Sequence, residues 1–161
     1  ALLLEAGAKA NAEVFQQRLQ NARLSRMGTT LVFALAYKSR LTLLHAGDSR
    51  CYRVDSHKLE PLTHDHSMVQ QMLDEGAITE QDVDKVPFRN MLTKAVGIEE
   101  GLQYSLTTLN TEPGQQFLLC SDGLFNALSE RVIHEIVQDS GDISQQVHSL
   151  IKQLQNLITE T

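Results

Sequence analysis

Residues 117–126, which read F-L-L-C-S-D-G-L-F-N, form the segment around which the rest of the chain is organised. Residues 117–120 form a short apolar run without a period, which is typical of a strand buried on both faces, although a buried helical segment shows the same pattern. Asp122 follows this run, and a carboxylate at the end of a buried strand needs a partner that compensates its charge. A cation such as Mg²⁺ or Mn²⁺ is one such partner. The alternative is that Asp122 caps the turn that begins at Gly123.

A second stretch, R-L-T-L-L-H-A-G-D-S-R at residues 40–50, repeats this arrangement upstream. Its first part predicts a mostly buried strand over residues 41–47, and Asp48 follows that strand directly. Two apolar strands that each end in an aspartate are what a sandwich needs to assemble a carboxylate cluster at one rim. The alternative is an ordinary turn in which Arg50 pairs with Asp48 at the surface.

Composition limits the classes of protein and partner. With 161 residues, of which 42% are hydrophobic, the chain favours a single domain over residues 1–161 with a real core. The net charge of −6 argues against nucleic acid or an anionic membrane as a partner, because both require a basic face. No apolar run approaches the ~18 residues that span a bilayer, and no signal peptide is visible. Cys51 and Cys120 belong to no C-x-x-C pair and are expected as reduced core thiols. We therefore expect a cytoplasmic monomer.

The other elements follow from periodicity and capping residues. A helix is predicted over residues 1–23, with Ala6, Ala10 and Val14 on its core face, and Ser129 is predicted to cap a helix over residues 130–137. A last amphipathic helix is predicted over residues 143–157, and its apolar side consists of Val147, Leu150, Ile151, Leu154 and Leu157. Strands are predicted over residues 31–37, 51–54, 90–96 and 103–109, the first forming an antiparallel hairpin with residues 41–47.

Residues 63–90 interrupt the strands and have the character of a flap. An apolar helix face begins at Met68, Gly76 is a helix stop, and residues 79–82 form a capping box with Asp82 in its last position. The H-D-H sequence of residues 64–66 invites a zinc interpretation, but it lacks the spacing of known zinc sites. Asp65 as the cap of the following helix is the favoured alternative.

Together these stretches resemble the protein phosphatase 2C family of metal-dependent Ser/Thr phosphatases in its bacterial form. The resemblance runs in family order through five stretches: residues 27–30 (M-G-T-T), 45–50 (H-A-G-D-S-R), 62–67 (L-T-H-D-H-S), 89–97 (R-N-M-L-T-K-A-V-G) and 118–124 (L-L-C-S-D-G-L). The resemblance implies an α+β fold, a four-layer α-β-β-α sandwich of two antiparallel sheets flanked by helices. It also implies a binuclear Mn²⁺ or Mg²⁺ site with a possible third metal, where a metal-activated water attacks phosphoserine or phosphothreonine.

The resemblance also assigns roles to residues. Asp122 would be a core metal ligand that also helps to hold a third metal, and Asp48 would be the other ligand of that third metal. Residues 65–90 would form the substrate flap, which includes Asp65, His66, Ser67 and Asn90.

Other signatures of the family lie outside residues 1–161. They are its phosphate-binding arginine, its first Glu-Asp pair, an Asp-Gly strand and a closing Asp-Asn motif. The sequence also starts without methionine or a helix cap. We therefore expect an excerpt that is incomplete at both ends, and expect these 161 residues alone to be poorly soluble and inactive.

The function implied is a cytoplasmic protein Ser/Thr phosphatase that acts on phosphorylated proteins, the targets of a Ser/Thr kinase, in signalling. One alternative is a catalytically inactive phosphatase-like interaction module. The presence of both Asp48 and Asp122 disfavours it, since an inactive homologue has no chemical need for either. Another alternative is an active phosphatase domain within a larger regulatory protein.

Overall fold

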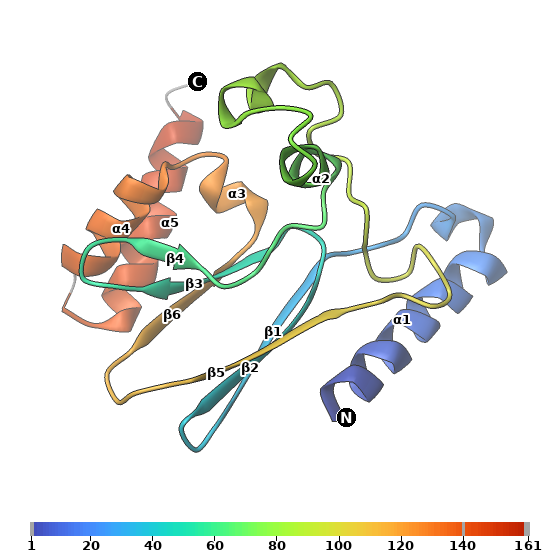
Figure 1. Cartoon of the computed structure of the whole chain (residues 1–161), viewed down its shortest axis with the longest axis horizontal. Helices are drawn as coiled ribbons and strands as arrows, with labels where there is room; N and C mark the ends of the chain where they lie inside the picture. The colour runs from blue at the N-terminus through green and yellow to red at the C-terminus, as the bar shows by residue number, and fades with distance from the viewer. Residues whose placement is uncertain (1, 140, 160–161) are drawn as a thin grey trace. The chain divides into compact units, whose positions relative to one another are not determined.

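The computed structural model describes residues 2–139 and 141–159 and divides into two compact units. Unit 1 comprises Ala1–Ser49 and Thr63–Glu112, and unit 2 comprises Arg50–Leu62 and Pro113–Thr161. Each unit contains one three-stranded sheet whose paired strands are antiparallel, together with helices (Figure 1). The predicted α+β class with two antiparallel sheets is therefore confirmed.

The sheet of unit 1 has the strand order β1-β2-β5. Its strands are β1 (Leu31–Tyr37), β2 (Arg40–Ala46) and β5 (Ser105–Asn110). The predicted hairpin between β1 and β2 is present, in a register that pairs Leu31 with Ala46 and Tyr37 with Arg40. Central strand β2 carries the core of this unit, because Leu43 and Ala46 are fully buried.

Helix α1 (Leu2–Gln20) is present as predicted, but the face that it buries is different. Its buried residues are Gly7 and Asn11, whereas Ala6 and Ala10 are exposed, so the predicted Ala6 and Ala10 stripe is wrong. A Cβ atom on Gly7 would lie 3.1 Å from the Leu44 side chain of β2, so this face approaches the sheet closely. Small and polar residues therefore form this contact, a pattern that hydrophobic periodicity does not detect. Ala1, the first residue of the predicted helix, lies outside the described residues.

Asn11 is buried because it binds a turn far along the chain. Its Nδ2 donates to the carbonyl oxygens of Glu99 at 2.8 Å and Glu100 at 3.1 Å. Its Oδ1 accepts from the backbone N–H of Gly97 at 2.7 Å. Gly97 has a φ of +86°, and a Cβ there would lie 2.2 Å from Val14 Cγ1. One amide side chain thus holds the turn at residues 97–100 against α1.

Replacing Asn11 with alanine is expected to lower the free energy of unfolding by about 2–3 kcal/mol, because the buried N–H of Gly97 loses its acceptor. Denaturant unfolding of the full-length protein measures the change. Gln17→Ala is the matched control, since the Gln17 amide donates only to the exposed Glu13 on the same helix in the contacts described. Equal stability of the two variants would contradict the role of Asn11.

The predicted flap contains α2 (Met68–Asp74) and a 3₁₀ helix, η2 (Glu80–Lys85). Gly76 follows α2 with a φ of +68°, as its prediction as a helix stop requires. The Asp82 side chain accepts from the Thr79 N–H at 3.3 Å, as a capping box requires. The predicted strand over residues 90–96 is wrong, because among the described residues this segment forms only two isolated bridges, Ser67 with Leu92 and Thr29 with Val96.

The sheet of unit 2 has the order β4-β3-β6 and packs against the helices of the same unit (Figure 1). Its elements are β3 (Arg50–Val54), β4 (Leu59–Pro61), β6 (Gln116–Cys120), α3 (Asp122–Phe125), α4 (Glu130–Asp139) and α5 (Ile143–Thr159). The core of the unit consists of Tyr52, Leu59, Leu124, Leu128, Ile133, Val137 and Leu150. Ser129 Oγ accepts from the Val132 N–H at 3.4 Å, so the predicted start of α4 is confirmed.

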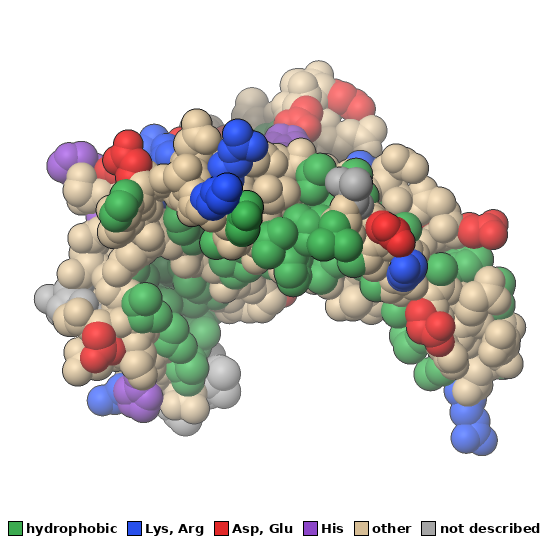
Figure 2. All heavy atoms as spheres, turned by 90° about the horizontal axis from the view of Figure 1, so that it is seen from below, with side chains coloured by type: hydrophobic (Ala, Val, Ile, Leu, Met, Phe, Trp, Pro, Cys, Tyr) green, Lys and Arg blue, Asp and Glu red, His purple; other side chains and the backbone are tan. Residues whose placement is uncertain are grey.

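One prediction for unit 2 is wrong in part, whereas the predicted last helix is present as α5. Strand β6 is not buried on both faces, since Leu119 is 41% exposed. On α5, Leu150 is buried, but Val147 and Ile151 are 47% and 48% exposed. These side chains line an apolar groove of about 650 Å³ between β6, α3 and α5. Figure 2 shows one face of the molecule, on which hydrophobic side chains (green) lie exposed among polar ones.

Cys51 lies in β3 and Cys120 in β6, and neither forms a disulfide bond, as predicted. Burial raises the pKa of the Cys51 thiol to about 11, so this group is protonated near neutral pH and belongs to the core. Among the helices that the structure describes, none has the length and apolar character of a membrane span.

Candidate active site

Asp48 lies in a tightly constrained turn at the end of β2. The preceding Gly47 has a φ of +105°, which L side chains rarely adopt, and a Cβ there would lie 2.4 Å from Thr30 Cγ2. The Oγ atoms of Thr30 and Ser49 are 2.8 Å apart, a hydrogen bond that closes the turn on its other side. The Asp48 residue itself is half-buried.

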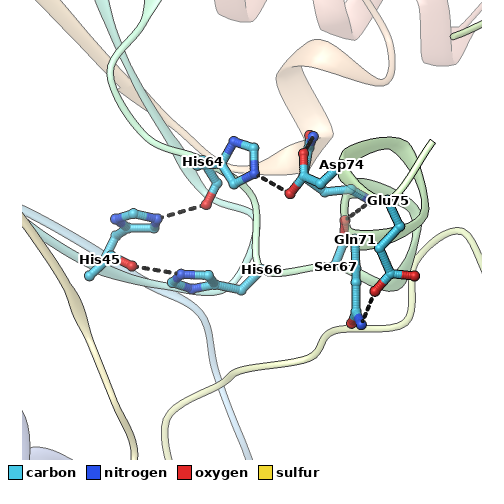
Figure 3. A network of polar contacts seen from close by, with 9 residues as sticks. His45, His64, His66, Ser67, Gln71, Asp74 and Glu75 are labelled. Carbon is cyan, nitrogen blue, oxygen red and sulfur yellow. Dashed lines mark hydrogen bonds and ion pairs between the residues drawn. The ribbon is translucent and has the colours of Figure 1, made fainter.

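The first residues of the flap form a network of polar contacts with β2. The imidazole rings of His45 and His66 stack with their centroids 4.6 Å apart and their planes 3° apart (Figure 3). His45 Nε2 donates to the backbone oxygen of His64 at 2.9 Å. His64 turns outward, and its own Nε2 lies 2.7 Å from Asp74 Oδ2 of α2. His64 and His66 thus point away from each other, which excludes their sharing a zinc ion in this arrangement.

The hydrogen bonds of His66 define its protonation state. Its Nδ1 accepts from the Gly47 N–H at 3.2 Å, so this nitrogen carries no proton. Its Nε2 lies 2.8 Å from Ser105 Oγ and carries the single proton of the neutral ring, which it donates to that oxygen. Burial, followed by the charges of His45, Lys94 and His64, lowers the pKa of His66 to about 4. Burial also lowers the pKa of His45.

The stacked histidines are expected to make the fold sensitive to acid. The unfolded chain binds a proton at His66 near pH 6.5, whereas the folded chain does so only near pH 4. Stability is therefore complete above about pH 6.5 and falls as the pH is lowered through this window. For His66 alone, the free energy of unfolding is expected to drop by about 2 kcal/mol between about pH 7 and pH 5. His45 adds to the loss.

Denaturant titrations of the full-length protein at several pH values between about 7 and 5 measure this effect above the range in which ordinary carboxylates titrate. A His66→Asn variant should show a shallower dependence, since it lacks the titrating ring. A wild-type stability that does not change across this range would contradict the buried neutral pair.

The other predicted flap residues differ in their surroundings. Ser67, not Asp65, caps α2, since Ser67 Oγ accepts from the Gln70 N–H at 3.2 Å. The preference for Asp65 as the cap is therefore wrong. Asp65 is half-buried and Asn90 is exposed. Contact of Asp65, His66, Ser67 or Asn90 with a substrate stays a prediction.

Asp122 is the first residue of the short helix α3, directly after β6 and the N-cap residue Ser121. It is half-buried, and its Oδ2 lies 3.5 Å from Asn126 Nδ2 within the same helical turn. The sequence left two roles open for this carboxylate, and the long Asn126 contact makes only a weak local cap. This contact involves one of the two carboxylate oxygens, and it leaves most of their capacity to accept hydrogen bonds or to bind a metal ion unused.

Arg50 stabilises the turn that carries Asp122, a role that the sequence did not reveal. Its guanidinium lies 3.8 Å from the ring centroid of Phe125 in α3, a cation–π contact. Its Nη1 donates to Tyr52 Oη at 2.9 Å and lies 4.0 Å from Glu130 Oε1 of α4. Burial raises the pKa of Tyr52 to about 12, so its hydroxyl stays protonated. The guanidinium thus joins β3 to α3 and α4, the first two of the three helices that follow β6.

The donor chemistry suits a hard divalent ion, but the chain does not complete a metal site by itself. Carboxylate oxygens are the ligands that Mn²⁺ and Mg²⁺ prefer, and the strand-end residues Asp48 and Asp122 supply them. Over residues 2–139 and 141–159, however, no group of three or more His, Cys, Asp or Glu side chains is placed to hold a metal ion. Asp48 lies in unit 1 and Asp122 in unit 2.

Known proteins resemble this chain over most of its length. The family model described as Protein phosphatase 2C matches residues 1–158. The serine/threonine phosphatase stp of Listeria monocytogenes is 33% identical over 141 residues, which are 88% of this chain and 56% of that protein. The chain therefore spans about half the length of the curated relatives that it resembles.

Two solved structures share the fold. Serine/threonine phosphatase Stp1 from Staphylococcus aureus matches with a TM-score of 0.89 and 28% identity, over 96% of this chain and 61% of that one. The catalytic domain of the phosphatase PstP in complex with 2 manganese ions matches with a TM-score of 0.78 and 33% identity, over 89% of this chain and 59% of that one. The family match over residues 1–158 and the shared fold agree, and the chain belongs to the protein phosphatase 2C family.

Proposed function

We propose that the full-length protein is a metal-dependent protein phosphatase that hydrolyses phosphoserine and phosphothreonine in proteins. The observation that carries this proposal is the family match over residues 1–158, which includes both strand-end aspartates. The manganese ions of the PstP structure support Mn²⁺ as the cofactor. Bound divalent ions supply an activated water and charge stabilisation at the phosphoryl group in such enzymes. The binuclear site, the third metal and the use of Mg²⁺ are parts of this proposal.

Within this function, Asp48 and Asp122 contribute carboxylate oxygens, and residues 63–90 form a flap beside the substrate. The support for the first role is the chemistry and position of the two residues, each of which is half-buried and lies two residues after the last residue of a strand. Because the described residues form no metal-holding group by themselves, we expect residues 1–161 alone to show no turnover. The tests therefore use the full-length protein. A single domain, a cytoplasmic location, the monomeric state and an opposing Ser/Thr kinase stay predictions.

The test is hydrolysis of a phosphothreonine peptide by the purified protein before and after removal of divalent ions with a chelator. Turnover is expected to disappear with the chelator and to return when excess Mn²⁺ is added. A phosphotyrosine peptide of the same sequence is the matched substrate control and is expected to react more slowly. Hydrolysis that persists without divalent ions would contradict the metal-dependent mechanism, and no hydrolysis under any condition would favour an interaction module.

A further inference from the structure

His66 uses every polar group that it has, in its side chain and its backbone. The ring bonds Gly47 and Ser105, as described above. The backbone N–H of His66 donates to the Gly47 oxygen at 2.9 Å, and its own oxygen accepts from the Thr93 N–H at 2.9 Å. The residue is buried, with 9% of its surface exposed. One residue therefore joins the end of β2, the start of β5 and the segment that returns from the flap.

The two bonds between His66 and Gly47 act directly on the residue before Asp48. Both the N–H and the carbonyl oxygen of Gly47 bind His66, so the two peptide planes that meet at Gly47 are oriented by one partner. Thr30 packs where a side chain on Gly47 would lie and limits movement in that direction. Because the Gly47 carbonyl belongs to the peptide bond with Asp48, the backbone that carries the Asp48 carboxylate is held by His66.

The same residue stands at the base of the flap. Ser67, the next residue, caps α2. The Met68 N–H donates to the Met91 oxygen at 2.8 Å, which brings the two ends of the flap together. The stacked His45 ring orients His66 from the β2 side, where its own Nε2–H fixes the His64 carbonyl (Figure 3). A shift of the base of the flap therefore moves His66 Nδ1 and the His66 N–H, the two groups that bind Gly47.

We propose that His66 is a positioning residue that couples the base of the flap to the Gly47-Asp48 turn and thereby sets the place of the Asp48 carboxylate. This inference rests on the proposed function, in which Asp48 is a metal ligand. It gives His66 a structural task at the site in place of contact with the substrate. The bond that matters most is the one from the Gly47 N–H to His66 Nδ1.

Two substitutions of similar polarity separate the contacts of the ring. In His66→Asn the amide oxygen reaches the position of Nδ1 and keeps the Gly47 acceptor, whereas the Ser105 contact is lost. In His66→Gln the longer amide reaches the position of Nε2 and keeps the Ser105 contact, whereas the Gly47 acceptor is lost. His57→Gln, in an exposed turn of unit 2, is the control for loss of an imidazole.

Mn²⁺ binding to the full-length variants is measured by calorimetry, and kcat is measured at saturating Mn²⁺ with p-nitrophenyl phosphate. His66→Gln is expected to bind Mn²⁺ about tenfold more weakly, the size typical of residues that orient metal ligands. His66→Asn and His57→Gln are expected to stay within about twofold of the wild type, less than such residues usually cost. A purely structural role would lower the stability of both His66 variants without separating their Mn²⁺ affinities.

Equal Mn²⁺ affinity of the Gln and Asn variants, or weaker binding by the Asn variant, would overturn the role of His66. Calorimetry measures these Mn²⁺ affinities directly, so the result does not depend on catalytic activity. A wild-type protein that binds Mn²⁺ but hydrolyses no phosphate ester would instead refute the proposed function, while the comparison of the two variants would still test the positioning role.

Discussion

Replacing Asp122 with alanine in the full-length protein is expected to lower kcat for a phosphothreonine peptide by about 100-fold or more. Metal-ion stabilisation of a transition state is worth several kcal/mol, and each 1.36 kcal/mol corresponds to about a tenfold change in rate. Asp122 is half-buried at the start of α3, and its only described side-chain contact is the long one to Asn126. Its removal is therefore expected to cost little stability, and the loss should appear in turnover.

Glu5→Gln is the matched control for the loss of one carboxylate. Glu5 pairs with Lys9 on the exposed side of α1, where both side chains are more than half exposed, and surface pairs of this kind contribute little. Steady-state kinetics at saturating Mn²⁺ compare the two variants, and circular dichroism checks that both are folded. An Asp122→Ala protein that retains wild-type kcat would refute the assignment of Asp122 and would favour an interaction module.

Replacing Gly47 with alanine is expected to lower the free energy of unfolding by about 3 kcal/mol or more. The substitution combines an unfavourable backbone conformation at a φ of +105° with a collision of the new Cβ with Thr30 Cγ2 at 2.4 Å. Strained backbone conformations cost about 1–3 kcal/mol, and overpacking costs about the same again. Because Gly47 is buried and bound on both sides by His66, the turn has little room to relax.

Gly76→Ala separates these two causes. Gly76 also has a positive φ, of +68°, but no atom lies within 4 Å of the position of a Cβ. This control should therefore lose only about 1–2 kcal/mol, the cost of a left-handed conformation. Urea unfolding of both variants measures the difference. A Gly47→Ala protein as stable as Gly76→Ala would show that the Thr30 contact imposes no constraint on the turn.

Much of the fold is predictable from the sequence because local patterns determine it. The β1–β2 hairpin follows from two apolar runs separated by a short polar turn, and Ser129 and Gly76 mark helix ends through their own chemistry. The predictions fail where distant partners decide the structure. The contact face of α1 depends on Asn11, whose partners lie 86 or more residues away. No periodicity in residues 2–20 reveals such partners.

The candidate site was only partly predictable for the same reason. The sequence places Asp48 and Asp122 correctly at the ends of strands, because an apolar run followed by a small residue and a carboxylate is a local signal. It does not reveal that His66 stacks on His45 or that Arg50 lies over Phe125. These contacts join residues 21 and 75 positions apart in the sequence, a separation that no local pattern spans. The sequence argued against a zinc site at residues 64–66, because the spacing of known zinc sites is absent. The burial of His66 became evident only from the structure.

A crystal structure of the full-length protein grown with Mn²⁺ and examined by anomalous diffraction tests the metal assignment most directly. If Asp122 is a metal ligand, a manganese peak lies within bonding distance of its carboxylate oxygen, and the assignment requires the loss of that peak in an Asp122→Ala crystal. Manganese bound only at sites away from both Asp122 and Asp48, in a protein that hydrolyses phosphothreonine, would contradict it.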